Sequence, residues 1–295
     1  MKNIEIIPFE HASSFRRIAA VAWDPPQNPT IYGSIVVRAE RLQAWLERQR
    51  ELTGERLTIT HAVARAAAIV MARHPDMNGF VRGASLVLRK DVDVFLQVAI
   101  PSAERLGETD LSGVVIRNAD RKDIATVARE LRAGAERIRK GEDKAFQKTK
   151  GQARLLPGFV FRWALKLIRF LQYRLNLNPS FLGAPRDPFG SIMVTSLGMM
   201  GISFAFAPFF PMGVAPVLLL VGAVEDTVVP EDGKPVVVKA FRLNGTMDHR
   251  FIDGVHAAIL SRELQALLED PEQLELGPSG PREGGERGGD GGGGT

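Results

Sequence analysis

The spacing of apolar residues along the chain predicts several helices. In residues 39–52, Leu42 and Leu46 lie one turn apart and share a face with Trp45, as in an amphipathic helix. A second helix is expected at 60–73, beginning with a threonine, Thr60, as its cap. The same periodicity predicts two more helices: 123–139 and 254–268.

Runs rich in valine, leucine and phenylalanine predict strands between these helices. The expected strands are two within 84–100 and one each at 114–116, 193–195, 217–224 and 236–243. The apolar stretch 204–224 contains prolines, which favour a loop leading into a buried strand over a membrane-crossing helix. Because the two patterns alternate without a long linker or a repeat, we expect one mixed α/β domain.

The composition agrees with a single globular domain. The 295 residues are 45% hydrophobic, which suffices for a core of ordinary size. The 38 basic and 34 acidic residues give a net charge of +4, too balanced to indicate nucleic acid as a partner. The absence of cysteine excludes disulfides, a thiolate nucleophile and cysteine-ligated metal. It also fits a reducing compartment, and the N terminus does not resemble a signal peptide, so a cytoplasmic location is expected.

The C-terminal segment differs from the rest of the chain. Ten of the 29 glycines fall from Gly277 onward, in a stretch without large apolar residues. We therefore expect a folded domain over 1–276 and a disordered, glycine-rich tail over 277–295. A tail that tethers a partner is the alternative.

One histidine has neighbours that suggest chemistry. His249 is followed four positions later by Asp253, at the expected start of the last helix, and then by Gly254. A histidine can act as a general base, and a nearby carboxylate can orient it directly or through an intermediary. Gly254 would let the backbone turn without a side chain in the way. Alone the pattern is weak, since a histidine near a helix start is more often a surface or core residue.

The sequence gives the remaining histidines no comparable indication of a catalytic or metal-binding role. His256 has no partner that the sequence reveals, and we expect it to be structural. His11, His61 and His74 lack the spacing to acidic residues that is typical of metal ligands, so no metal site is expected.

The residues around His249 resemble a known family. The segment 245–258, Gly-Thr-Met-Asp-His-Arg-Phe-Ile-Asp-Gly-Val-His-Ala-Ala, resembles the C-terminal part of dihydrolipoamide acyltransferases, the catalytic cores of 2-oxo acid dehydrogenase complexes. Further motifs resemble the same family in the same order: 57–60, 74–78, 90–94, 118–120 and 190–201. The resemblance covers about residues 10–276, and an ordered set of motifs is more specific than any one of them.

The resemblance implies a fold and an assembly. The expected fold is α/β, a mixed-sheet sandwich with flanking helices of the chloramphenicol acetyltransferase type, which forms trimers. His249 is then the general base, and the hydroxyl of Thr195 stabilises the oxyanion, with the two residues meeting across two chains. An early arginine of the family pairs with the motif aspartate. Arg16 or Arg17 matches it, and we prefer Arg17 as the support of Asp253 because Ile-Ala follows it as in the family.

The implied reaction moves an acyl group between coenzyme A and a thiol or hydroxyl acceptor, in a ternary complex without a covalent enzyme intermediate. Coenzyme A or acyl-CoA is thus an expected substrate, and a trimer or a multiple of trimers the expected assembly. No lipoyl domain precedes the core, so we expect no lipoyl attachment on this chain and a lipoyl-bearing partner protein. Two positions depart from the family's pattern: Ser196 replaces the usual asparagine, and the strand before Asn118 lacks the usual proline. The resemblance therefore does not identify the acyl acceptor.

An apparent insertion at about 149–188 departs most from the family. Its stretch 159–177 contains no acidic residue, while three cations recur about one turn apart: Arg162, Lys166 and Arg169. One interpretation is an amphipathic helix packed on this domain or on a neighbouring subunit. The other is a helix in the plane of a membrane, with the cations at the headgroups and Phe159, Trp163, Phe170 and Leu171 below them.

Two rival functions stay open at this level. In the first, the fold is a catalytically silent homo-oligomeric scaffold that recruits partner enzymes or a membrane surface. In the second, the chain is a membrane-associated acyltransferase that acts on a lipid or another hydrophobic acceptor. The His249, Asp253 and Thr195 pattern favours an enzyme over a scaffold.

Overall fold

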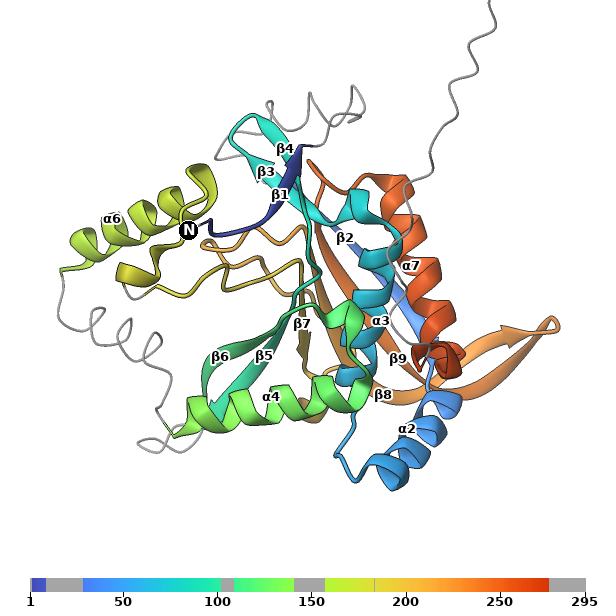
Figure 1. Cartoon of the computed structure of the whole chain (residues 1–295). Coiled ribbons are helices and arrows are strands. Elements are labelled where there is room, and N and C mark those ends of the chain that lie inside the picture. Colours follow the sequence, from blue (N-terminus) through green and yellow to red (C-terminus); the bar gives the residue numbers. More distant parts are fainter. Residues whose placement is uncertain (1, 9–28, 102–108, 141–156, 183, 276–295) are drawn as a thin grey trace, which may run out of the picture.

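The computed structural model describes residues 2–8, 29–101, 109–140, 157–182 and 184–275, and a six-stranded sheet lies at its centre (Figure 1). The strand order is β2-β9-β8-β7-β5-β6. The strands are β2 (Thr30–Arg38), β5 (Val94–Pro101), β6 (Thr109–Ile116), β7 (Ile192–Ser196), β8 (Val217–Glu231) and β9 (Lys234–Asp248). Strand β7 runs parallel to β5 and β8, whereas the other pairs are antiparallel, so the sheet is mixed.

A smaller antiparallel sheet has the order β1-β4-β3. Its strands are β1 (Ile6–Pro8), β3 (Gly79–Arg82) and β4 (Ser85–Arg89). Phe80 and Val87 of this sheet form a buried apolar cluster with Ile4 and with Tyr173, whose ring lies edge-on to that of Phe80. The small sheet therefore holds the segment around Tyr173 against the domain.

Helices α3, α4 and α7 cover one face of the central sheet, and α2 lies at their end (Figure 1). Their bounds are α2 (Glu40–Thr53), α3 (Ile59–Arg73), α4 (Ile124–Arg139) and α7 (Gly254–Glu269). Helix α3 contacts both α4 and α7, and its residues are buried without a break from His61 to Met71. Alanine occupies five of these positions, which lets the neighbouring helices approach closely. The main core lies between these helices and the sheet.

The four helices predicted from apolar spacing are confirmed, each end lying within one residue of the prediction. The predicted cap of α3 is wrong, because Thr58 and not Thr60 is the N-cap. Thr58 has extended backbone geometry, and its side chain accepts from the backbone of His61 while the Nδ1 atom of His61 accepts from Thr58 N at 3.0 Å. Burial lowers the pKa of His61 to about 4, because the charged form loses its water.

All the predicted strands lie within observed ones, but the structure has more strand than the sequence pattern shows. Strands β1, β2 and β3 were not predicted, and β8 and β9 each extend to 15 residues. Their outer ends form a hairpin that extends beyond the helices, where Val228 and Val237 are exposed (Figure 1). Backbone pairing continues there although Glu225, Asp226 and Pro230 interrupt the apolar pattern on which the strand prediction depends.

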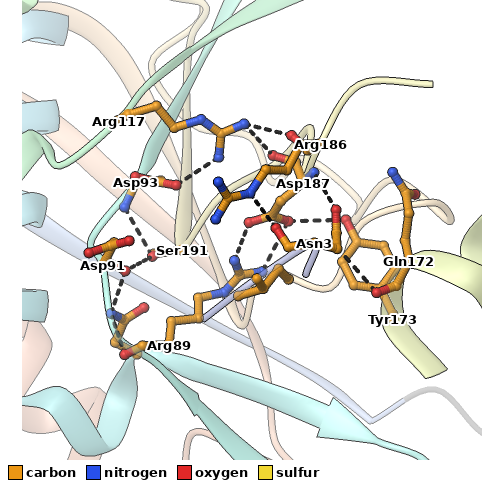
Figure 2. Close-up of polar contacts among 12 residues, drawn as sticks. Asn3, Arg89, Asp91, Asp93, Arg117, Gln172, Tyr173, Arg186, Asp187 and Ser191 are labelled. Atoms are coloured by element: carbon orange, nitrogen blue, oxygen red, sulfur yellow. Dashed lines mark hydrogen bonds and ion pairs between the residues drawn. The ribbon is translucent and has the colours of Figure 1, made fainter. Parts of the chain in front are cut away.

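A buried ion pair joins β4 to the chain that precedes β7 (Figure 2). The guanidinium group of Arg89 donates twice to the carboxylate of Asp187, and both side chains are almost fully buried. The hydroxyl group of Tyr173 donates to the same carboxylate at 3.2 Å, and Asp187 N donates to Asn3 Oδ1 at 3.1 Å. Burial lowers the pKa of Arg89, but the Asp187 carboxylate outweighs it and the pKa is raised.

Candidate active site

His249 lies in a tight turn directly after β9. Phe251 N and Ile252 N both donate to Asp248 O, at 2.9 and 2.8 Å. The side chains of Phe251 and Ile252 are buried in the main core. Arg250 folds back onto Asp248 with hydrogen bonds of 3.0 and 2.6 Å, which raise the pKa of Arg250. Core packing and this ion pair therefore hold the turn in one conformation.

The turn defines the tautomer of His249. Its Nδ1 atom lies 3.0 Å from Ile252 O. Since a carbonyl oxygen can only accept, the proton of the neutral imidazole is on Nδ1, and Nε2 is the unprotonated nitrogen. The backbone N–H of His249 donates to Pro29 O at 2.8 Å, and its side chain is half-buried. The site thus presents Nε2 as the basic nitrogen.

Asp253 is the N-cap of α7. Its Oδ1 atom accepts from Val255 N and His256 N, both at 3.0 Å, and lies 2.5 Å from His256 Nδ1. These contacts tie Asp253 to the first turn of α7, directly after the Ile252 carbonyl that orients His249. Asp253 therefore supports the turn that carries His249.

His256 has partners that the sequence did not reveal. Its Nδ1 atom faces Asp253, and its Nε2 atom lies 3.0 Å from Asp76 Oδ2. Ionised carboxylates only accept, so both contacts are hydrogen bonds when the ring carries two protons. The sequence contained one signal of this contact: Asp76 and His256 lie in two segments, 74–78 and 245–258, that both resemble the acyltransferase family.

Thr195 lies near the C-terminal end of β7, opposite Leu220 of β8. Side chains alternate along a strand, so Thr195 shares a face with Met193, which packs with Phe95 and Leu218 on the side of the sheet away from the helices. Ser196 is on the helix-covered side, and its hydroxyl oxygen accepts from Gly198 N at 3.3 Å.

Within one chain Thr195 and His249 are far apart. Thr195 is level with Leu220 and, through it, with Asn244 of β9. Asp248, the last residue of β9, is four residues further along, which is about 13 Å in a strand, and β9 is two strands away, which adds about 10 Å sideways. The two side chains of one chain therefore cannot reach the same carbonyl group.

An exposed apolar surface follows Thr195. Met199 and Met200, in the 3-10 turn directly after β7, are 98% and 61% exposed. Ile202 and Phe204 continue this surface, and Phe204 packs against Phe206. Exposed apolar side chains gathered in this way are typical of protein–protein or membrane interaction sites and of ligand-binding grooves.

An open cavity of about 400 Å³ lies at the same end of β7, on the helix-covered side. Its lining combines α2, the start of α3 and the turn after β7. The polar lining includes Gln43, Arg50, Thr58 and Ser196. The cavity is thus next to the Thr195 end of the sheet, at the opposite end from His249.

Two predicted support residues have different outcomes. Arg17 lies outside the described residues. Gly254 is the first residue of α7, its φ is outside the left-handed region, and an added Cβ would meet no atom within 4 Å. The described part of the chain therefore gives no steric reason for glycine at Gly254, contrary to the expectation from the sequence.

Comparison with known proteins identifies the family. The chain matches the family described as 2-oxoacid dehydrogenases acyltransferase (catalytic domain) over residues 18–153 and 189–276. It is 26% identical over 228 residues to the dihydrolipoyllysine-residue acetyltransferase component of the acetoin cleaving system of Bacillus subtilis, covering 77% of this chain and 45% of that protein. The chain spans less than half the length of the curated relatives it matches first.

Solved structures share the fold. Dihydrolipoamide acetyltransferase of Azotobacter vinelandii superposes with a TM-score of 0.61 at 22% identity, covering 85% of both chains. The cubic core of a pyruvate dehydrogenase multienzyme complex superposes with a TM-score of 0.60 at 23% identity, again over 85% of both chains. The predicted mixed-sheet α/β fold is therefore confirmed. Because the family match spans most of the sequence, the chain belongs to the family of 2-oxoacid dehydrogenase acyltransferase catalytic domains.

Proposed function

We propose that this protein transfers an acyl group between coenzyme A and a thiol or hydroxyl acceptor, with His249 as the general base. The observation that carries the proposal is the contact between His249 Nδ1 and Ile252 O, which makes Nε2 the basic nitrogen. The Azotobacter relative supports it, since the histidine and asparagine studied there for their catalytic roles are four positions apart, as are His249 and Asp253.

The reaction proceeds by direct transfer. His249 Nε2 takes the proton of the acceptor thiol or hydroxyl group, and the resulting anion attacks the thioester carbonyl carbon. The hydroxyl group of Thr195 donates a hydrogen bond to the oxyanion of the tetrahedral intermediate. When the intermediate collapses, the carbon–sulfur bond of acyl-CoA breaks, and His249 returns its proton to the leaving thiolate of coenzyme A.

The site is formed between two chains. The separation of Thr195 and His249 along the sheet supports this, because each chain carries the Thr195 half of a site at one end of its central sheet and the His249 half at the other end. The exposed surface at Met199 and Met200 supports a subunit contact at the Thr195 end. We expect the assembly to be a homotrimer or a multiple of trimers, as the family resemblance implies, and one structural relative is the cubic core of a multienzyme complex.

The acyl group reaches this assembly on coenzyme A or on a lipoyl-bearing partner protein. The name of the Bacillus relative, a dihydrolipoyllysine-residue acetyltransferase component, supports such a partner. A cytoplasmic location stays a prediction from the sequence.

The test is free-thiol release from acetyl-CoA and longer acyl-CoAs, with dihydrolipoamide and a panel of small alcohols as acceptors. Wild type is compared with His249→Ala at the same oligomeric mass. We expect the variant to lose at least about 100-fold in turnover, the usual effect of removing a general base. If no donor and acceptor pair reacts while the wild type is a folded oligomer, the scaffold function replaces this proposal.

A further inference from the structure

Helix α6 (Gly158–Arg169) presents three parallel stripes of different chemistry. Each stripe has the same helical spacing, and each is shifted by one residue, or about 100° around the axis, from the one before. The stripes are basic (Arg162, Lys166, Arg169), apolar (Trp163, Leu167, Phe170) and apolar again (Ala164, Ile168, Leu171). Phe170 and Leu171 belong to the π-helical turn Phe170–Arg174, which continues the helix.

The first two stripes face solvent and the third does not. Trp163, Leu167 and Phe170 are 67%, 56% and 49% exposed, and the basic stripe is exposed as well. The third stripe is half-buried. Helix α6 thus has one half-buried apolar face and a second apolar face outside, next to the cations. Lys166 Nζ lies 5.1 Å from the centre of the Trp163 ring, so the two exposed stripes are in direct contact.

The orientation of α6 is set by the buried network that follows it (Figure 2). Gln172 and Tyr173 come directly after the helix and are both buried. Gln172 Nε2 donates to Pro185 O at 2.8 Å, and the hydroxyl group of Tyr173 donates to Asp187, the partner of Arg89. The helix is therefore attached to the domain at its C-terminal end, through Gln172 and Tyr173 (Figure 1).

We propose that the exposed stripes of α6 bind the surface of a membrane containing anionic phospholipid. Trp163, Leu167 and Phe170 would enter the boundary between headgroups and acyl chains, while Arg162, Lys166 and Arg169 pair with lipid phosphates and carboxylates. No acidic residue occurs between 159 and 177, so nothing in this stretch repels an anionic surface. This is contact with one leaflet, and no helix among the described residues is both long and apolar enough to cross a membrane.

The charge pattern favours lipid over a second copy of this chain. A symmetric contact between two α6 helices would bring two basic stripes together without acidic partners from the same stretch. The family match also stops at residue 153 and resumes at 189, so α6 lies outside the shared catalytic architecture. The inference is independent of the acyltransferase proposal.

The experiment is co-sedimentation of the full chain with phosphatidylcholine vesicles, either pure or containing about one third phosphatidylserine. Wild type is expected to bind the anionic vesicles at least about tenfold more tightly than the neutral ones. The variant with Arg162→Glu, Lys166→Glu and Arg169→Glu is expected to bind the anionic vesicles about 100-fold more weakly, because each cation contributes about a factor of five to the binding constant. Trp163→Ser with Leu167→Ser is expected to weaken binding even though it keeps every charge.

A matched control carries the same charge change on another surface helix. The exchange Arg129→Glu, Arg137→Glu, Arg139→Glu on α4 alters exposed residues and is expected to change binding by less than about threefold. Equal losses in the α4 and α6 triple variants would overturn the proposal, and so would binding that survives the α6 exchange. A changed oligomeric mass in the Trp163 and Leu167 variant would identify the stripe as a subunit contact. Acyl transfer to a soluble acceptor is expected to be unchanged in the α6 variants.

Discussion

Thr195 and His249 lie at opposite ends of the central sheet of one chain, two strands apart. Thr195 is level with Asn244, and β9 continues from there toward His249 for more than 10 Å. The oxyanion donor and the general base of the proposed reaction can therefore act together when they come from two neighbouring chains. This relationship makes catalysis depend on the assembly, and it can be tested without a structure of the oligomer.

Mixed oligomers of two inactive variants are expected to recover activity. Thr195→Ala and His249→Ala chains, carrying different tags and expressed together, each contribute the intact half that the other lacks. In a random equal mixture about a quarter of the sites combine a normal threonine with a normal histidine. Double purification keeps the trimers that contain both variants, and in these one site in three is complete. Turnover of the purified mixture should therefore approach about a third of wild type, while each pure variant is nearly inactive. If Thr195 and His249 of the same chain formed the site, the mixture would stay as inactive as its components.

Asp253 is expected to act by positioning the turn that carries His249. Asp253→Ala removes the cap of α7 and should lower stability by about 1 kcal/mol and the kcat by more than about tenfold, with little change in KM. Asp253→Asn keeps a capping oxygen and should stay within about threefold of the wild-type kcat. Steady-state kinetics and denaturant unfolding of the two variants provide the measurement. A kcat that falls equally in both would show that the charge of Asp253, and not its cap, is needed.

His61 is expected to make the protein less stable in mild acid. Burial lowers its pKa from 6.5 to about 4, so the folded state holds the neutral form. The resulting stabilisation is fully present above pH 6.5 and is lost as the pH falls from 6.5 to about 4, by about 3 kcal/mol. His61→Gln retains an acceptor for Thr58 N, the usual partner in a capping box, but does not titrate.

Denaturant unfolding of wild type and His61→Gln at pH 7.5 and at pH 4 measures this effect. The free energy of unfolding should fall by about 3 kcal/mol more in the wild type than in the variant. Parallel losses in the two proteins would mean that other groups account for the acid sensitivity.

Removal of the Asp187 carboxylate is expected to be strongly destabilising. Asp187→Ala leaves the charge of Arg89 buried without its ion-pair partner and should cost about 3 to 5 kcal/mol. Arg41→Ala breaks pairs with Asp270 and Glu272, all exposed, and should cost less than about 1 kcal/mol. The double variant Asp187→Ala, Arg89→Met should recover part of the loss, because it removes the unpaired charge. Urea unfolding of these proteins gives the comparison, and equal costs for Asp187 and Arg41 would contradict it.

Local features of the fold were predictable because their causes are local. The apolar spacing of α4 and α7 follows from the turn of a helix, and both were located within one residue. His249 and Asp253 are separated by three residues, so their proximity is a property of the chain itself. The cap of α3 was misplaced because Thr58 and Thr60 are equally good caps in sequence, and backbone geometry chooses between them.

The sequence alone determined the fold class, the helices, the candidate base and the unusual chemistry of residues 159–177. The tertiary structure decided which distant groups meet. Arg89 pairs with Asp187, 98 positions away, and His256 lies against Asp76, 180 positions away. It also decided that Thr195 and His249 are separated within one chain. Periodicity records which face of an element is buried, whereas contacts between elements depend on how sheets and helices pack in three dimensions.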